Sequence, residues 1–160
     1  MNERTIAVLT ASDAGARGER EDTSGQVLRE GLARVGRVVA SRIEPDDEER
    51  LVAVLRQWVA EGIGLIATTG GTGLGPRDVT PEATRRVIER EVPGIAEEMR
   101  RVSASITPFG MLSRGVVGVA GQSLIINFPG SPKACRELLP VVLPILPHAL
   151  DLLAGRTHHH

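Results

Sequence analysis

The most informative stretch of the sequence is TTGGTGLGPRDVTPEA, residues 68–83. It follows the apolar run at 64–67, which predicts a buried strand that ends in a loop. The glycines allow positive φ and let a ligand approach the backbone, so that successive loop amides can point at an anion. Thr80 and Pro81 then predict an N-cap and the first residue of a helix, whose positive end would lie beside the glycine loop. The stretch therefore predicts an anion-binding site at the end of a strand.

The glycine loop differs from the common phosphate-binding loops. A Walker loop needs Gly-Lys followed by Ser or Thr, whereas Gly75 is followed by Pro76 and Arg77. Its Gly-x-Gly-x-Gly spacing also misses the dinucleotide-binding fingerprint. We expect the loop to bind phosphate through its amides, with Arg77 as a cation and Asp78 as a carboxylate beside them. A turn that only lets a helix pack on the sheet is the alternative.

The composition indicates one globular domain. Apolar residues make up 41% of the 160 residues, enough for the core of a single domain at residues 1–157. Residues 158–160, all histidine, resemble the start of a purification tag and are excluded. The net charge of −1 predicts no nucleic-acid partner, and no apolar run reaches the roughly 18 residues of a membrane span. Cys135 is the only cysteine, so we expect no internal disulfide, a reducing cytoplasmic location and an unreactive thiol.

The first half of the chain alternates strand and helix signals. Short apolar runs that suit strands buried on both faces are separated by segments in which apolar residues recur at helical spacing. Glycines close these helical segments. We expect strands at 6–10, 38–43 and 65–68, helices at 22–36 and 45–62, and a polar loop at 11–21.

The second half continues the alternation. We expect helices at 80–90 and 95–106, followed by neighbouring strands at 116–120 and 123–127. Ser131-Pro132 predicts the start of another helix in the same cap pattern as Thr80-Pro81. The last segment, 138–153, is apolar but interrupted by prolines, so it predicts either a kinked helix or a partly irregular region, available for burial between subunits.

Together these elements predict an α/β fold. Strands that alternate with helices form a three-layer α/β/α arrangement, a mainly parallel sheet with helices on both faces. In such sheets ligands bind beyond the carboxyl ends of the strands. The polar motifs all follow strands, so we expect them on one rim: 12–13, 46–47, 70–78 and 127–131.

The chemistry of that rim favours phosphate transfer. Clustered carboxylates without histidine or cysteine suit a hard cation such as Mg²⁺, which prefers oxygen ligands and bridges to phosphates. Mg²⁺ and loop amides suit phosphoryl or nucleotidyl transfer, in which positioning and charge neutralisation do most of the catalysis.

Several motifs resemble the MogA/MoaB family, which includes the matching domains of gephyrin-like and plant molybdenum-cofactor proteins. TGGTG at 69–73 followed by RDVTPEA at 77–83 resembles the family signature. The remaining motifs occur in the family's order and cover nearly the whole chain: Ser12-Asp13 before DTSG at 22–25, ITPF at 106–109 before MLSR at 111–114, and NFPGSP at 127–132. The resemblance implies a molybdopterin-binding-like fold, in the short MoaB-like branch.

The resemblance also implies an activity. Family members transfer AMP from ATP to the terminal phosphate of molybdopterin, releasing pyrophosphate and giving adenylyl-molybdopterin. It implies Mg²⁺ as cofactor, a homotrimer or homohexamer, and the molybdate-inserting enzyme of the same pathway as a partner. The short branch contains inactive members, so a non-catalytic molybdopterin-binding protein is one alternative. A competence-damage-type nucleotide pyrophosphatase-like domain is another, which the run at 77–83 disfavours.

Residue by residue, the resemblance assigns Asp78 and Asp46 as the catalytic carboxylates and Mg²⁺ ligands. Asp46 or Asp47 could instead only cap the following helix. Arg77 and Arg114 are candidate phosphate cations, with surface or subunit ion pairs as the alternative. Binding of nucleotide, pterin or phosphate is expected at Ser12, Asp13, Gly70, Gly71, Thr72, Gly73, Ser103, Asn127, Pro129, Gly130 and Ser131, with helix capping as the alternative at Ser12 and Asp13.

Overall fold

A computed structural model describes residues 3–156, and the histidines expected to be a tag lie outside them. Its sheet contains β1 (Thr5–Ala11), β2 (Arg37–Glu44), β3 (Leu65–Thr69), β4 (Arg90–Glu91), β5 (Val117–Ala120) and β6 (Ser123–Phe128). The strand order is β2-β1-β3-β6-β5-β4. β2, β1, β3 and β6 are parallel neighbours, whereas β5 runs antiparallel to β6 and β4 antiparallel to β5. The mainly parallel sheet is therefore confirmed.

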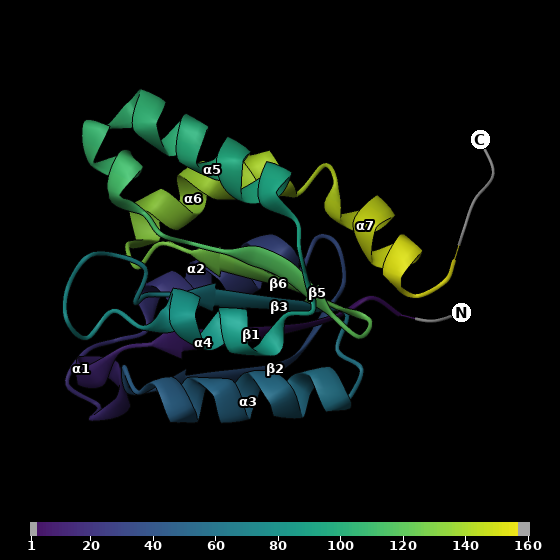
Figure 1. The fold of residues 1–160 in the computed structure, drawn as a ribbon, viewed down its shortest axis with the longest axis horizontal. Helices are drawn as coiled ribbons and strands as arrows, with labels where there is room; N and C mark the ends of the chain where they lie inside the picture. Colours follow the sequence, from purple (N-terminus) through teal and green to yellow (C-terminus); the bar gives the residue numbers. More distant parts are fainter. Residues whose placement is uncertain (1–2, 157–160) are drawn as a thin grey trace.

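Helices cover both faces of this sheet (Figure 1). α2 (Thr23–Leu32), α5 (Pro93–Ile106), α6 (Pro132–Val142) and α7 (Leu146–Leu153) pack on one face. α3 (Glu48–Ala60) and α4 (Thr80–Val87) pack on the other. The short α1 (Asp13–Ala16) and the 3-10 helix η1 (Pro108–Leu112) lie in the loops beyond the strands. These layers confirm the predicted α/β/α architecture.

The alternation of side chains along β1 divides the core in two. Ile6 and Val8 join the cluster under α2, α5 and α6, whereas Ala7 and Leu9 join the cluster against α3. Successive residues of a strand point to opposite faces, so a strand between two helical layers must be apolar throughout. The central strands therefore hold the loops at their ends on a rigid base.

The region after α4 departs from the prediction. The helix expected at 80–90 ends at Val87, and Ile88 is extended with ψ 146°. Arg90 and Glu91 then pair with β5 as the edge strand. Gly118 permits this pairing, since a Cβ there would lie 2.8 Å from the Arg90 carbonyl oxygen and 2.6 Å from Ile88 Cδ1. A two-residue strand leaves no periodic signal in the sequence.

Two other segments also differ from the prediction. The polar loop expected at 11–21 contains α1, which Ser12 caps. In the proline-interrupted tail, α6 continues through Pro140 to Val142, and α7 follows after a short break. Apart from exposed Ile145 and Leu152, the large apolar side chains of this tail are buried or partly buried against the chain's own core, and its burial between subunits stays a prediction.

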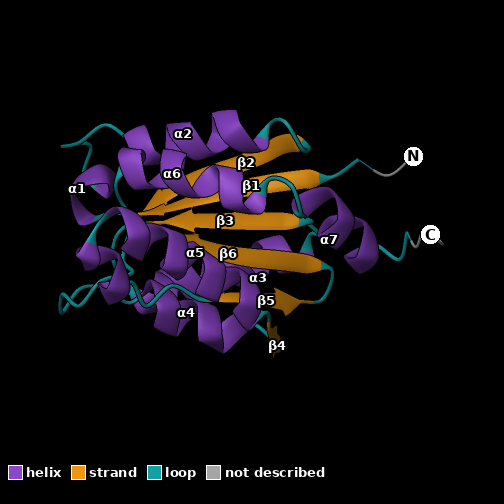
Figure 2. Ribbon diagram, turned by 90° about the horizontal axis from the view of Figure 1, so that it is seen from above, coloured by secondary structure: helices purple, strands orange, loops and turns teal. Residues whose placement is uncertain are grey.

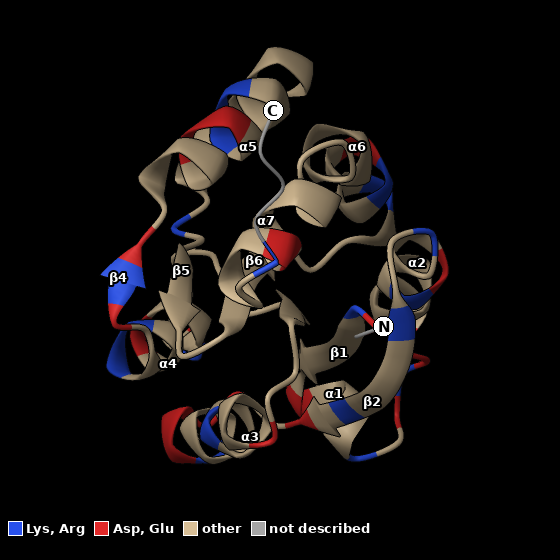
Figure 3. Ribbon diagram, turned by 90° about the vertical axis from the view of Figure 1, so that its right-hand side faces the viewer, with Lys and Arg blue, Asp and Glu red and all other residues tan. Residues whose placement is uncertain are grey.

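Charge is mixed over the outer elements. Basic and acidic positions are interspersed along α3, α4 and β4 (Figure 3). No helix within residues 3–156 is long and apolar enough to cross a bilayer.

Candidate functional site

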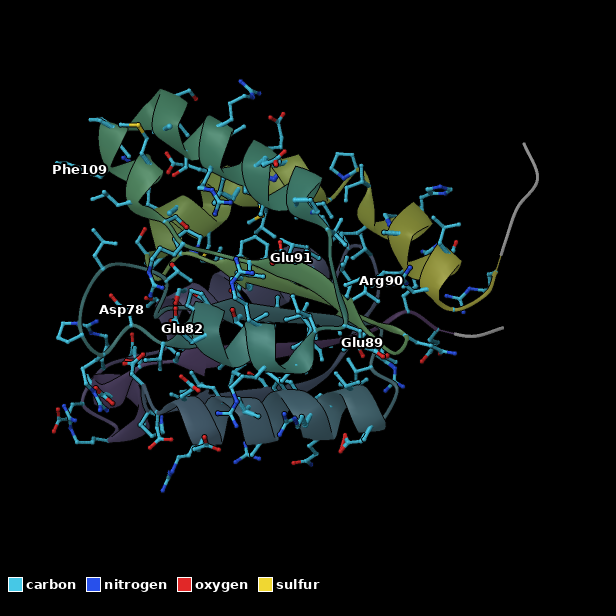
Figure 4. All side chains as sticks on the ribbon, viewed as in Figure 1. Asp78, Glu82, Glu89, Arg90, Glu91 and Phe109 are labelled. Carbon is cyan, nitrogen blue, oxygen red and sulfur yellow. The ribbon has the colours of Figure 1, made fainter. Side chains whose placement is uncertain are left out.

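The candidate site lies where the parallel strands end. β1, β2, β3 and β6 point their carboxyl ends to the same edge of the sheet, and α1 and the glycine loop lie beyond it (Figure 2). Asp78 and Phe109 mark this end of the molecule (Figure 4). The predicted rim is therefore present, and two cavities open on it.

The first cavity is polar and has a volume of about 520 Å³. Its walls come from the end of β1, the loop that leads to α2, and the glycine loop. Ser12, Asp22, Asp46 and Thr69 are among the polar residues that line it. The hydroxyls and carboxylates of this lining suit a polar ligand that is accompanied by a cation.

The second cavity is mainly apolar and has a volume of about 420 Å³. It lies between α5, η1, α6 and the ends of the central strands, and its walls include Met99, Phe109, Val117 and Leu138. Such walls suit a flat ring system held by a few polar groups. Gly71, Asp78 and Gly130 line both cavities, so a ligand in one would meet a ligand in the other at Asp78.

The glycine loop passes through this junction in a conformation that requires glycine. Gly70 and Gly71 have φ values of +91° and +71°. A Cβ on Gly70 would lie 2.3 Å from the Ala11 carbonyl oxygen, and one on Gly71 would lie 2.3 Å from Thr80 Oγ1. The loop thus packs directly against β1 and the start of α4.

Thr80 closes the loop instead of capping the helix. It is the first residue of α4, and its hydroxyl donates to the Gly70 carbonyl at 2.9 Å while its amide donates to Gly71 at 3.1 Å. The N-cap position belongs to Val79, which makes no side-chain capping bond. The predicted capping role of Thr80 is therefore wrong, because its hydrogen bonds fix the glycine turn.

Asp46 and Asp13 join two loops at the edge of the polar cavity. The Asp13 amide donates to Asp46 Oδ2 at 3.1 Å, and the Asp46 amide donates to Asp13 Oδ1 at 3.0 Å. Arg77 adds two bonds to the Asp13 carboxylate, at 2.9 and 3.1 Å, and thereby lowers the pKa of Asp13. The Asp13 carboxylate thus ties the glycine loop to the loop after β2.

Asp47, not Asp46, caps the helix that follows. Asp47 Oδ1 accepts a hydrogen bond from the Arg50 amide at 3.1 Å at the start of α3. Asp46 Oδ1 is buried and makes no hydrogen bond within residues 3–156. Burial raises the pKa of Asp46, opposed by the Asp13 amide and reinforced by the negative charges of Asp13 and Asp78. The capping alternative for Asp46 is thus removed, and one of its oxygens is left to bind something else.

Asp78 is held by its own loop. Its Oδ2 accepts the Gly75 amide at 2.9 Å, and a Cβ on Gly73 or Gly75 would lie only 3.0 or 2.9 Å from that oxygen. Arg114 donates to the carbonyls of Gly73 and Asp78, both at 2.8 Å, and pairs with Glu82 at 2.6 Å. With all its guanidinium nitrogens engaged, Arg114 clamps the loop, so the structure favours the ion-pair alternative over a phosphate cation.

Comparison with known proteins agrees with this geometry. The family described as "Probable molybdopterin binding domain" matches residues 7–148. The chain belongs to this family. The crystal structure of the molybdopterin biosynthesis enzyme MoaB from Thermus thermophilus is 54% identical, with a TM-score of 0.88 over 94% of this chain and 96% of that chain. The resemblance inferred from the motifs is confirmed.

Two relatives found by sequence carry related names. The molybdopterin adenylyltransferase of Helicobacter pylori is 39% identical over 157 residues, which span 94% of this chain and 88% of that protein. The molybdenum cofactor synthesis protein cinnamon of Drosophila melanogaster is 42% identical over 156 residues, 96% of this chain. This molybdopterin-binding family member spans only 26% of the length of cinnamon.

Three predicted contact residues also make structural hydrogen bonds. The hydroxyls of Ser12 and Ser131 accept amides at the starts of α1 and α6, at 2.9 and 3.0 Å. The Asn127 side chain is buried: its oxygen accepts the Val116 amide, and its nitrogen donates to two threonine hydroxyls, Thr68 and Thr84. Ser131 lines neither cavity, whereas Ser12 and Asn127 each line one.

Seven further predicted residues line the cavities, whereas Asp13 and Arg77, which pair with each other, line neither. Ser103 lines the apolar cavity beside Gly110, where a Cβ would lie 2.6 Å from Ser103 Oγ. Thr72, Gly73 and Pro129 line the same cavity, Gly70 lines the polar cavity, and Gly71 and Gly130 line both. These residues form the walls around Asp78.

Sequence reasoning missed a role for Asp22. It caps α2, which begins close to the predicted start at residue 22, and it also accepts the Thr10 hydroxyl at 2.9 Å and pairs with Arg29 at 3.2 Å. These bonds attach the far wall of the polar cavity to the end of β1. The sequence indicates the helix start, but it does not indicate the hydrogen bond to Thr10, because that bond joins the two ends of the loop between β1 and α2.

Cys135 is buried and structural, as expected. Its thiol donates to the Pro129 carbonyl at 3.3 Å, and burial raises its pKa to about 11. Within the part of the chain described, no group of three or more His, Cys, Asp or Glu side chains forms a metal cluster.

Proposed function

We propose that this chain transfers AMP from ATP to the terminal phosphate of molybdopterin, releasing pyrophosphate. The observation that carries the proposal is the meeting of a polar and an apolar cavity at Asp78, Gly71 and Gly130. ATP would place its phosphates in the polar cavity, and molybdopterin would place its ring in the apolar one. The acceptor phosphate and the α-phosphate of ATP would then meet at the junction.

The residues at the junction would act by positioning the two phosphates. An oxygen of the molybdopterin phosphate attacks the α-phosphorus of ATP, and the bond to pyrophosphate breaks. The glycine-loop amides orient the phosphates, and the fixed loop conformation means that little reorganisation is needed during transfer. Ser103 would contact the ring-bearing substrate.

Asp46 and Asp78 fit a bound Mg²⁺. The fit rests on the buried Asp46 Oδ1, which lacks a hydrogen-bond donor among the described residues, and on the all-oxygen chemistry of the two carboxylates. A Mg²⁺ site in nucleotide enzymes commonly takes only one or two protein carboxylates and completes its ligands with phosphates. The ion would neutralise phosphate charge in the polar cavity.

We also propose that the chain acts in the cytoplasm as a homo-oligomer, a trimer or a hexamer, upstream of the molybdate-inserting enzyme. An exposed apolar strip supports self-association: Ile106, Phe109, Met111 and Leu112 are 47%, 75%, 68% and 49% exposed. The lone buried cysteine suits a reducing compartment.

Product analysis tests the proposal. The chain is incubated with molybdopterin, ATP and Mg²⁺, and nucleotide products are separated. We expect adenylyl-molybdopterin and pyrophosphate in equal amounts, formed only when molybdopterin is present. Binding of molybdopterin without any product would support the non-catalytic alternative, and molybdopterin-independent cleavage of nucleotides would support a pyrophosphatase.

A further inference from the structure

Among residues 3–156, Arg100 is the one cation that lines the apolar cavity, and Asp78 is the other charged residue in its lining. It lies on α5, half-buried, and its Nη1 donates to the Gly115 carbonyl at 2.8 Å and more weakly to Ser113 at 3.4 Å. Within residues 3–156, these carbonyl contacts are its only hydrogen bonds, and no carboxylate pairs with it. Arg100 therefore carries an uncompensated positive charge at the wall of a mainly apolar cavity.

Two arginines next to the glycine loop are already paired with carboxylates. Arg77 binds the Asp13 carboxylate and Arg114 binds Glu82. An arginine has five N–H donors in a planar fork, and Arg100 uses those of Nη1, so Nε and Nη2 keep donors for a ligand. The carbonyls of Ser113 and Gly115 fix the fork, which lowers the entropy lost when an anion binds.

We propose that Arg100 binds the anionic group of the pterin in the apolar cavity and so selects a phosphorylated pterin over a neutral one. The inference rests on the proposed function, since it assumes that a pterin occupies this cavity. Arg100 would then determine which pterin binds, although it lies on α5 and belongs neither to the glycine loop nor to the carboxylates Asp46 and Asp78. A purely structural role, in which Arg100 only holds the turn at 113–115, would give no such discrimination.

The test compares two probes that differ by one phosphate: 6-hydroxymethylpterin and its monophosphate. Calorimetry measures both affinities for the wild-type chain and for Arg100→Gln and Arg100→Lys. Arg101→Gln is the matched control, because Arg101 is the next residue of α5, loses the same charge, pairs with Glu98 and does not line the cavity. Thermal unfolding checks that each variant is folded.

We expect Arg100→Gln to weaken binding of the phosphorylated probe by about tenfold or more, the scale of one charge-assisted hydrogen bond, and to leave the neutral probe nearly unchanged. Arg100→Lys should keep part of the preference, and Arg101→Gln all of it. Equal losses for both probes, or no loss for either, would contradict the inference while leaving the proposed function intact. A wild-type chain that binds neither probe would contradict both.

Discussion

Asp46 keeps a buried carboxylate oxygen without a hydrogen-bond donor among residues 3–156. Such a group destabilises the folded chain when ionised, because burial removes water and the nearby charges of Asp13 and Asp78 repel it. Functional sites commonly lower the stability of the free protein, and a bound ligand then offsets this loss. Asp46 therefore has a signature of function that a helix cap would lack.

The first prediction concerns stability against pH. The folded-state pKa of Asp46 is raised above its unfolded value, so its ionisation penalises folding once the pH exceeds the unfolded pKa of about 3.9. The loss of folding free energy grows as the pH rises toward the folded-state pKa, and it is constant at pH values above that pKa. Asp46→Asn should therefore raise the free energy of unfolding at pH 7, and the gain should vanish below about pH 4. Urea unfolding across pH 3–8 measures this.

Glu97→Gln serves as the control for the Asp46 experiment, because Glu97 is an exposed carboxylate on α5 away from both cavities. It should show no comparable gain. A destabilised Asp46→Asn at neutral pH would contradict the buried-charge account and indicate a structural role.

Asn127 gives a second prediction at this scale. Its side chain connects β6 to the Val116 amide and to Thr68 and Thr84 through buried hydrogen bonds. Asn127→Ala should therefore cost about 1–3 kcal/mol in the free energy of unfolding, since it leaves buried polar groups unpaired. Chemical denaturation measures the loss. Ligand affinity that falls while stability stays unchanged would instead support the direct contact that the sequence predicted.

At the scale of elements, the 70–79 loop is a rigid insertion between β3 and α4. Thr80 closes its glycine turn, and Arg114 clamps the part that carries Asp78. The periodic segments of the sequence predicted the strands and helices on either side. They could not predict these bonds, because Arg114 is distant in the sequence and its partners are backbone carbonyls.

Loss of the Arg114 clamp should loosen this loop. Arg114→Gln is expected to cost about 1–3 kcal/mol in stability and to speed hydrogen exchange of amides at 73–78, because charged bonds to two carbonyls are lost. Arg85→Gln is the matched control, since Arg85 lies on α4, directly after the loop, and forms an exposed pair with Glu91 of β4. Unchanged exchange in the loop of Arg114→Gln would show that the glycine turn alone holds it.

For the whole molecule, the sequence predicted the three layers of helices and sheet, but it did not predict which apolar side chains stay exposed. Helical and strand periods place α2, α3 and β1 correctly, whereas burial of the proline-rich tail depends on packing between distant elements. The rim itself followed from strand order, since polar motifs after parallel strands must meet. Which serines cap helices and which face a cavity required the structure.

The exposed strip around η1 leads to a prediction about assembly. Phe109 and Met111 are 75% and 68% exposed. Large apolar side chains exposed together commonly mark a surface that binds another protein chain. We expect light scattering at micromolar concentration to show a trimer or hexamer, and Phe109→Ser with Met111→Ser to shift it toward monomer. A single species of 17.1 kDa in the unmodified chain would rule out self-association.

If the two substrates meet at Asp78, Asp78→Asn should abolish transfer without abolishing binding. The variant keeps the side-chain volume and removes the charge at the junction of the two cavities. Single-turnover adenylyl transfer is measured together with the affinities for ATP and molybdopterin. We expect at least about a 100-fold loss of transfer, with the fold intact and both substrates still bound. Transfer near the wild-type rate in a folded Asp78→Asn chain would contradict this expectation.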